Sequence, residues 1–418
     1  MTLESRLLDQ LSSSLQLLHE PVDRLVLAFS GGLDSCVLLH LLSLYPTKFK
    51  VLTWHVNHGL LENACEMENF CQSVASQYNF EFMVSRLHLN SKEGNLEARA
   101  RKARYAVFEE SLNQADCVLT AHHADDQVET FLLNSLRASG SAGLRGIADY
   151  KNLGNYQLIR PLLSVSRGDL ERYAGEAGLQ WFEDPSNQSD RFDRNYLRNQ
   201  VIPLIKQRWP KYCDSIRTVC DIQAETQQLL DELALSDYQQ CSKMTDAGKI
   251  NLVQTRLVLL SNARQKNLVR FWLKDQGYDN LPRKKLAELI RQIGVSGESS
   301  AVIHSSDFDI RCYQKQLYLV PHFDPLRLSP AYDLDKSELL IIKELNLRIS
   351  RDQVFKRFEL QDNNQSVSIR FRPQDQSADG SRHRLKRLFQ KYQIPPWRRP
   401  QIPQVYIDDQ LVGLWLEK

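Results

Sequence analysis

The chain has 418 residues, of which 42% are hydrophobic, and a formal net charge of only +2. This length exceeds that of one typical domain, so we expect two or three. The sequence has no signal peptide and no long apolar segment, and its eight cysteines include no Cys-x-x-Cys pair. We therefore expect a cytoplasmic protein with reduced thiols that is not inserted in a membrane.

Strand-like and helix-like segments alternate through the first half of the chain. Strands are predicted at residues 25–29, 51–56, 80–87, 117–121 and 157–163, and helices at 36–44, 64–77, 96–113, 125–136 and 167–177. This alternation predicts an α/β fold with a parallel sheet covered on both faces. Because ligands of such sheets bind at the carboxyl ends of the strands, motifs that follow the first, second and fourth strands should meet in one cleft.

The pattern changes after about residue 210. Helices are predicted at 226–235, 254–261, 265–275 and 284–293, followed by short strands at 301–304 and 317–321. Beyond about residue 326 the chain mixes a helix at 381–392 with strands at 339–342, 367–371, 405–407 and 411–415. We predict an α/β domain over 1–212, a mainly helical middle domain over 213–325 and a small mixed α/β domain over 326–418.

A glycine-rich turn joins the first predicted strand to the first predicted helix. Its residues are Ser30, Gly31, Gly32, Leu33, Asp34 and Ser35. Backbone N–H groups and a helix N-terminus meet in such a turn and bind phosphate. The turn lacks the lysine of a Walker A motif, and Asp34 would repel phosphate unless a cation stood between them. The turn therefore predicts a nucleotide site that works with Mg²⁺; the alternative is a structural turn with Ser30 as the helix N-cap.

Polar residues also follow the second and fourth predicted strands. His58 lies in a turn that either contacts adenine or ribose or simply bends at Gly59. Asp125, Asp126 and Glu129 open the helix after the fourth strand, where they can hold Mg²⁺ or an ammonium group or supply a general base. The alternative is helix capping, because Asp126 and Glu129 have capping-box spacing. Zinc is disfavoured because the adjacent histidines 122 and 123 lack a separated third ligand.

Two basic segments are candidates for binding nucleic acid. Arg101 and Arg104 are neighbours on one predicted helix, where they either clamp a phosphate backbone or form a solvated face with Glu97. Between residues 366 and 400 lie two acids, four aromatic residues and nine basic residues, at positions 370, 372, 382, 384, 386, 387, 391, 398 and 399. Basic residues interleaved with aromatics suit a nucleic-acid backbone and unstacked bases, and a solvated basic helix is the alternative.

Together these motifs resemble the tRNA(Ile)-lysidine synthetase family, which belongs to the PP-loop ATP pyrophosphatases. The resemblance covers most of the chain and includes the Ser30–Ser35 turn, Val-Asn-His-Gly-Leu at 56–60, Glu97-x-x-x-Arg101-x-x-Arg104-Tyr, Thr-Ala-His-His-x-Asp-Asp-Gln-x-Glu-Thr at 120–130, Arg-Pro-Leu-Leu at 160–163, Asp-Pro-Ser-Asn at 184–187, Arg-Asn-x-x-Arg at 194–198 and Ile-Pro-Pro-Trp at 394–397. One departure is Ala138, where the family usually has glycine. We expect the loop there to keep its path with less freedom.

The resemblance implies a Rossmann-like catalytic domain of the adenine nucleotide alpha hydrolase type and a tRNA-binding C-terminal domain. Its reactants would be ATP with Mg²⁺, free L-lysine and a tRNA(Ile) with a CAU anticodon. The wobble cytidine would be adenylated and lysine would then displace AMP from carbon 2. The implied catalytic residues are Asp34, Asp125, Asp126, Glu129 and Arg101; the implied nucleotide-binding residues are Ser30, Gly31, Gly32, Leu33, Asp34, Ser35 and His58; and the implied magnesium ligands are Asp34 and Asp126.

Three other functions remain as alternatives. A tRNA 2-thiolation enzyme would need a cysteine pair or an iron–sulfur site, and the sequence has no Cys-x-x-Cys. A small-molecule amide synthetase would not need the basic C-terminal segment, and a non-catalytic tRNA-binding protein would not need the carboxylate cluster. The sequence leaves open which carboxylate is the base and whether the chain forms a homodimer.

Overall fold

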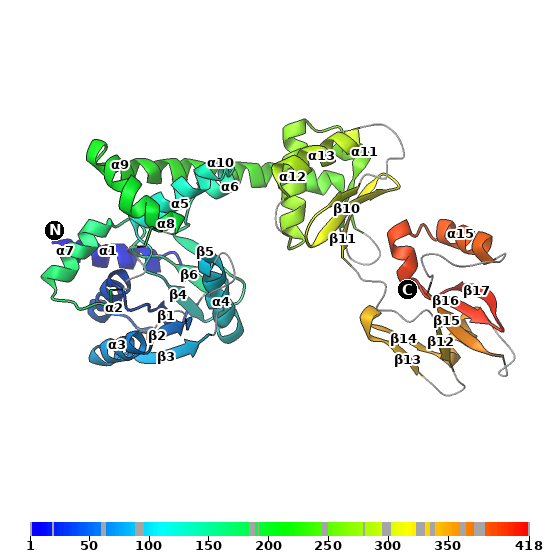
Figure 1. The fold of residues 1–418 in the computed structure, drawn as a ribbon, viewed down its shortest axis with the longest axis horizontal. Coiled ribbons are helices and arrows are strands. Elements are labelled where there is room, and N and C mark those ends of the chain that lie inside the picture. Colours follow the sequence, from blue (N-terminus) through cyan, green and yellow to red (C-terminus); the bar gives the residue numbers. More distant parts are fainter. Residues whose placement is uncertain are drawn as a thin grey trace. The chain divides into compact units, whose positions relative to one another are not determined.

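The computed structural model falls into two compact units, Met1–Leu230 and Asp231–Lys418, and each has hydrophobic cores of its own (Figure 1). The structure describes residues 2–18, 21–59, 64–87, 96–183, 189–190, 192–244, 250–278, 281–294, 302–322, 331–334, 339–359, 365–371 and 381–416, with only the backbone at 96–98, 344 and 381–382. The predicted turn at 184–187 and Arg372 lie outside these residues.

The first unit is built on a six-stranded sheet in the order β3-β2-β1-β4-β6-β5 (Figure 1). Five strands run parallel, and they are β1 (Arg24–Ala28), β2 (Lys50–Asn57), β3 (Glu81–Arg86), β4 (Asp116–Leu119) and β6 (Gln157–Ile159). The edge strand β5 (Tyr150–Asn152) is antiparallel to β6. The predicted parallel sheet is confirmed, and β5 is an addition of three residues too short to be recognised in the sequence.

Helices cover both faces of this sheet. The helices of this part of the chain are α1 (Leu3–Leu15), α2 (Leu33–Leu44), α3 (Ala64–Gln77), α4 (Leu96–Ser111), α5 (Ala124–Leu136), α6 (Ser141–Leu144) and α7 (Arg167–Glu176). Leu25 and Leu27 of β1 are buried against α1, α2 and α7, whereas Val26 is buried on the other face with Phe108 of α4. Burying each such side chain contributes about 1.5–3 kcal/mol, which explains why β1 is an unbroken apolar run.

Three further helical segments follow the sheet in the chain. They are α8 (Asp193–Tyr196), which continues through a π-helical turn (Leu197–Val201), then α9 (Ile202–Arg208) and α10 (Tyr212–Cys241). Val128 of α5, Ile202 and Tyr212 share a buried cluster, so α5, α9 and α10 pack together. Ala138, just after α5, has a positive φ of 54°, so the chain keeps a left-handed conformation where the family usually has glycine.

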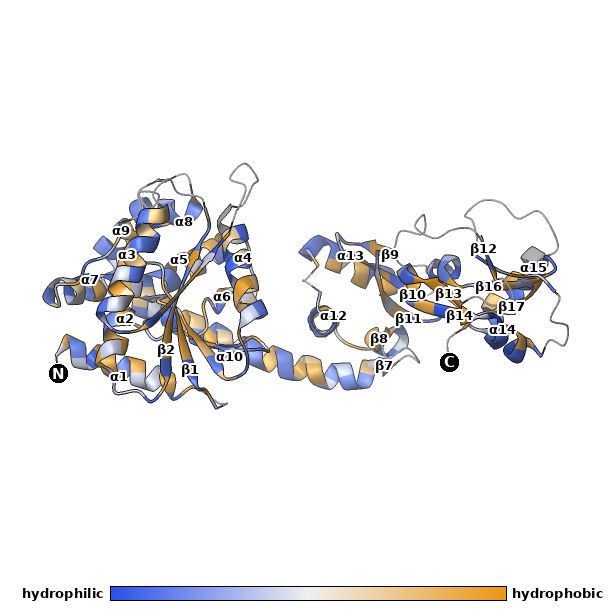
Figure 2. Cartoon of the chain, turned by 90° about the horizontal axis from the view of Figure 1, so that it is seen from below, coloured by the Kyte–Doolittle hydropathy of each residue, from blue (hydrophilic) through white to orange (hydrophobic). Residues whose placement is uncertain are grey.

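The second unit begins within α10 and continues with an antiparallel sheet packed against helices. The sheet has the order β7-β8-β11-β10-β9, with β7 (Ser242–Met244), β8 (Ile250–Val253), β9 (Val302–His304), β10 (Phe308–Tyr313) and β11 (Gln316–Pro321). Its helices are α11 (Gln254–Leu257), α12 (Asn262–Asp275) and α13 (Arg283–Gly294). The helices agree with the prediction, and the sheet adds β7, β8 and β10 to the two predicted strands. Apolar residues concentrate on the strands and on one side of each helix (Figure 2).

The last part of the chain is mixed α/β, as predicted. It contains a four-stranded sheet of β12 (Ala331–Leu334), β15 (Val367–Arg370), β16 (Gln404–Ile407) and β17 (Gln410–Leu414), and a hairpin of β13 (Leu339–Ile342) and β14 (Leu347–Ser350). Its helical segments are α14 (Arg351–Phe358), α15 (Ser381–Lys391) and the 3-10 turns Lys343–Leu345 and Pro396–Gln401. In the described part of the chain, no helix combines the length and the apolar character needed to cross a membrane.

Candidate active site

The predicted phosphate turn lies between the end of β1 and the start of α2. Gly31 has a positive φ of 79°, and a Cβ there would lie 2.8 Å from Sγ of Cys71, so only glycine fits without strain. Gly32 precedes α2 as its N-cap with an extended backbone. The Ser35 hydroxyl donates to the Gly32 carbonyl at 2.9 Å and lies 3.1 Å from Oγ of the exposed Ser30. Ser35 therefore braces the turn, and Ser30 presents its hydroxyl to solvent.

A large cavity of about 1760 Å³ opens at the carboxyl edge of the sheet, entirely within the first unit. Of the predicted site residues, the cavity is lined by Ser30, Gly32, Leu33, Asp34, His58, Asp125 and Glu129. Gly31 and Ser35 are buried behind the turn. The motifs that follow the first, second and fourth strands thus meet in one cleft, as the fold predicted.

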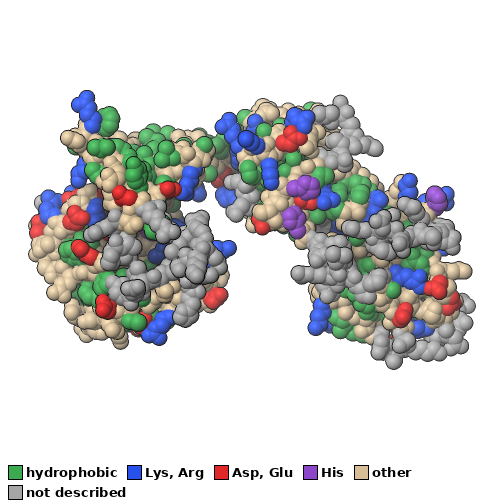
Figure 3. All heavy atoms as spheres, in the orientation of Figure 1, with side chains coloured by type: hydrophobic (Ala, Val, Ile, Leu, Met, Phe, Trp, Pro, Cys, Tyr) green, Lys and Arg blue, Asp and Glu red, His purple; other side chains and the backbone are tan. Residues whose placement is uncertain are grey.

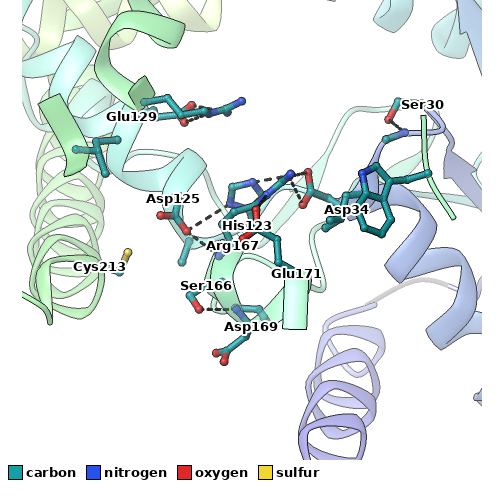
Figure 4. Close-up of a pocket in the computed structure, with 18 of the residues that line it drawn as sticks. Ser30, Asp34, His123, Asp125, Glu129, Ser166, Arg167, Asp169, Glu171 and Cys213 are labelled. Atoms are coloured by element: carbon teal, nitrogen blue, oxygen red, sulfur yellow. Dashed lines mark hydrogen bonds and ion pairs between the residues drawn. The ribbon is translucent and has the colours of Figure 1, made fainter. Parts of the chain in front are cut away.

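Asp34 is held by two side chains that the sequence did not link to it. Nη1 of Arg167 donates to both carboxylate oxygens of Asp34 at 2.7 Å, and Nε2 of His123 lies 3.8 Å away (Figure 4). Burial raises the pKa of Asp34, and the neighbouring His123 and Arg167 oppose that shift. A carboxylate in this position depends on a nearby cation for its charged form.

The carboxylates at the start of α5 have separate partners. Asp125 accepts hydrogen bonds from the Tyr212 hydroxyl at 2.6 Å and from the backbone N–H of Arg167 at 2.8 Å. Asp126 accepts from the backbone N–H of His123 at 3.0 Å, which completes a capping box. Burial alone would raise the pKa of Asp126, but His123, with further cationic neighbours, holds it below its ordinary value. Capping and proximity to the cavity therefore coexist in one helix turn.

Glu129 is fully buried between two arginines that follow the site in sequence. Nε of Arg194 lies 2.8 Å from one of its oxygens, and Nε of Arg198 lies 2.7 Å from the other. Arg198 also approaches Asp126 at 3.5 Å, and it sits on the π-helical turn at Leu197–Val201. Such turns are frequent at functional sites. Glu129 thus fixes two guanidinium groups, of which that of Arg198 belongs to a residue lining the cavity.

The two predicted basic residues on α4 lie in different surroundings. Arg101 is exposed and reaches the Tyr105 hydroxyl at 3.5 Å, and it is not among the residues that line the cavity. Arg104, one turn later, does line the cavity together with His58. Burial, reinforced by Arg104, lowers the pKa of His58 to about 4. Nδ1 of His58 is buried and has no hydrogen-bond partner among the described residues, so it is available to a ligand.

The donor set fits magnesium better than zinc. Asp34 and Asp126 both have an oxygen within 4 Å of Nε2 of His123, at 3.8 and 3.6 Å. Within the described ranges, no group of three or more His, Cys, Asp or Glu side chains could hold a metal ion. Mg²⁺ is usually bound by one or two carboxylates together with substrate phosphates and water, whereas zinc sites need three or four protein ligands. Two carboxylates beside a phosphate turn match the first requirement.

Arg167 and Tyr212 are site residues that sequence reasoning missed. Arg167 is the first residue of α7, and a cation at a helix N-terminus opposes the helix dipole. That unfavourable placement was a signal of a functional role in the sequence. Tyr212 carried no such signal, because its contact with Asp125 joins residues 87 positions apart.

Three family models match the chain: a PP-loop domain at residues 3–205, a TilS substrate binding domain at 252–318 and a TilS substrate C-terminal domain at 363–417. A tRNA(Ile)-lysidine synthase from Serratia proteamaculans (strain 568) is 38% identical over 405 residues, which cover 93% of this chain and 90% of that protein. The one from Coxiella burnetii (strain RSA 493 / Nine Mile phase I) is 34% identical, with 93% and 87% covered.

Among solved structures, the U34-tRNA thiolase NcsA from Methanococcus maripaludis has a TM-score of 0.45 and 16% identity, covering 53% of this chain and 80% of that one. The sequence relatives are the informative comparison, because their similarity spans the site and both C-terminal regions. The chain belongs to the tRNA(Ile)-lysidine synthase family.

Proposed function

We propose that this chain joins free L-lysine to carbon 2 of the wobble cytidine in a tRNA(Ile) with a CAU anticodon. In the first step, O2 of the cytidine attacks the α-phosphate of ATP, and pyrophosphate leaves. In the second step, the side-chain amine of lysine attacks carbon 2, loses a proton, and AMP leaves. The modified base pairs with A instead of G, so decoding changes from AUG to AUA.

One observation carries this proposal: a single cavity contains both a phosphate turn and an acidic helix start. Ser30 and Gly32 line the cavity together with Asp125 and Glu129. A nucleotide held at the turn would place its phosphates beside carboxylates suited to an ammonium group. The relatives named tRNA(Ile)-lysidine synthase support the same substrate pair.

The first step needs negative charge to be neutralised around the α-phosphate. The N-terminus of α2 and the guanidinium groups of Arg167 and Arg198 supply positive potential in the cavity. Asp34 and Asp126 would hold Mg²⁺, which polarises phosphoryl oxygens when bound. His58 would contact the base or ribose through its free Nδ1.

The second step needs a base, because a lysine ammonium group is not nucleophilic. Both oxygens of Glu129 are already held by the guanidinium groups of Arg194 and Arg198, so they are not open to a lysine ammonium group. Asp125 lines the cavity and accepts from the Tyr212 hydroxyl and the Arg167 N–H, and Nδ1 of His123 lies 3.8 Å from it. We therefore assign Asp125 as the group that orients and deprotonates lysine.

The test is the formation of AMP from ATP by the full chain with tRNA and lysine supplied separately. Pyrophosphate should appear with the CAU-anticodon tRNA(Ile) alone, and AMP release should require lysine as well. Lysine-independent AMP release, or equal activity with a methionine tRNA of the same anticodon, would contradict the proposal. Asp125→Asn should slow the lysine step by about two orders of magnitude, the scale of a missing general base, while pyrophosphate release persists.

A further inference from the structure

The guanidinium of Arg167 lies where a cation would bind Asp34. A single nitrogen, Nη1, is 2.7 Å from each oxygen of the Asp34 carboxylate, so it sits symmetrically between them (Figure 4). The arginine is otherwise anchored: its backbone N–H donates to Asp125, and its Nε donates to Glu171 at 3.0 Å. The end of the side chain is thus the part that is free to change partners.

The placement of Arg167 is unfavourable locally and is compensated across the cavity. It occupies the first turn of α7, where Ser166 is the N-cap and where a positive charge opposes the helix dipole. Asp34 lies in the first turn of α2, and its side chain is 24% exposed at the cavity. The ion pair between them therefore joins α2 and α7.

A metal ion and this guanidinium compete for the same oxygens. Two cations on one carboxylate repel each other, and a buried carboxylate needs only one of them. A free divalent ion therefore gains little at Asp34 while Arg167 is in place. A triphosphate changes this balance, because its oxygens attract both the ion and the guanidinium.

We propose that Arg167 occupies the metal position on Asp34 in the nucleotide-free protein, so that the metal ion enters only together with the nucleotide. The negative triphosphate draws the guanidinium off Asp34, and Arg167 then pairs with phosphate oxygens. This inference rests on the proposed use of ATP and Mg²⁺, and it adds an order of binding and a role for one arginine.

The experiment measures Mn²⁺ binding to the nucleotide-free full chain by electron paramagnetic resonance, with Mn²⁺ as the probe for the magnesium position. Wild type should bind weakly, and Arg167→Met should bind at least about tenfold tighter, which is about 1.4 kcal/mol. The double variant Asp34→Asn/Arg167→Met should lose that gain. The matched control is Arg172→Met on the same helix, because Arg172 pairs with Asp169 and not with Asp34; it should behave as wild type.

Tight Mn²⁺ binding by the nucleotide-free wild type would overturn the proposal, as would equal affinity in Arg167→Met. If Arg167→Met does not fold, the wild type alone still decides: adding a non-hydrolysable ATP analogue should raise Mn²⁺ affinity at least about tenfold, and no increase would refute the idea. These measurements contain no tRNA and no lysine, so their failure is distinguishable from a failure of lysidine formation.

Discussion

Acidic and basic side chains alternate around the cavity, and their pairing decides what each carboxylate can do. Asp34 faces Arg167, Glu129 faces Arg194 and Arg198, and Asp125 faces a hydroxyl. Both oxygens of Glu129 are held by guanidinium groups, which makes it a scaffold, whereas Asp125 lines the cavity and is the carboxylate that we propose exchanges a proton with lysine. The three residues are equivalent in type and different in role.

Glu129→Gln should destabilise the first unit by about 3 kcal/mol, because breaking a buried ion pair leaves the partner charges uncompensated. Urea unfolding followed by circular dichroism measures the change. Glu288→Gln is the control, since the contacts of Glu288 with Arg291 and Gln292 lie on the surface of α13 and their loss should change little. An unfolding midpoint equal to that of wild type would show that the ion pairs of Glu129 do not stabilise the first unit.

The lowered pKa of His58 predicts that the folded chain loses stability in acid. Its folded-state pKa of about 4 lies below the ordinary 6.5, so the unfolded chain binds a proton that the folded chain does not. The stabilisation of the folded state that comes from keeping His58 neutral is complete above pH 6.5 and is lost as the pH falls toward 4. His58→Asn should therefore flatten the fall of melting temperature across that window, while His383→Asn on exposed α15 should not. Parallel pH profiles for all three proteins would contradict the burial of His58.

The turn between β1 and α2 depends on two glycines for different reasons. Gly31 needs its positive φ and the space beside Cys71, whereas Gly32 has a φ of −75° that any residue adopts. A Cβ on Gly32 would meet only Oγ of Ser30, at 3.6 Å. The first glycine therefore shapes the turn, and the second leaves open space beside the cavity.

Gly31→Ala should lower the free energy of unfolding by about 2 kcal/mol or more, because left-handed backbone strain adds to the contact with Cys71. Gly32→Ala should cost less than about 1 kcal/mol, the usual range for an N-cap change. Chemical denaturation of the two variants compares them directly, and nucleotide affinity should be measured separately. Equal destabilisation would mean that the conformation of the turn does not distinguish the two glycines.

At the scale of the whole molecule, the second unit presents Lys and Arg side chains on its surface (Figure 3). On α15, Leu385 and Phe389 are buried, and Arg384, Lys386 and Arg387 are exposed. Other residues of the predicted basic segment are structural. Arg370 pairs with Asp409, and the Trp397 ring packs against Tyr318 at 5.5 Å and against Tyr313 at 6.0 Å. Arg398, beyond α15, is exposed as well, and we propose that the exposed basic face of α15 contacts RNA.

Neutralising Arg384, Lys386 and Arg387 together should raise the KM for tRNA and flatten its salt dependence, because each phosphate contact adds about 0.7–0.9 to the slope of log affinity against log salt. The KM for ATP should stay near that of wild type. The control removes three exposed basic residues elsewhere in the same region, Lys343, Arg348 and Lys356. If the α15 variant keeps the tRNA affinity and the salt dependence of wild type, this face of α15 does not contact tRNA and is only solvated.

The sequence determined the features that depend on local spacing. Alternating apolar runs indicated the parallel sheet, two glycines between a strand and a helix indicated the phosphate turn, and the acids at 125, 126 and 129 indicated a second motif at the same sheet edge. In the second unit, β10 alternates Phe308, Ile310 and Cys312 with polar residues, so that strand was also readable. The three residues of β7 were too few to form a pattern.

Only the tertiary structure decided which charges meet. Arg167 is 133 positions from Asp34, and Arg198 is 69 positions from Glu129. Spacing along a helix or strand specifies neighbours within a few residues, but a pair across a cavity depends on how strand order and crossovers bring distant helix ends together. The sequence therefore placed the carboxylates at one edge of the sheet, and the fold paired Glu129 with two arginines, Asp125 with a hydroxyl and Asp34 with Arg167.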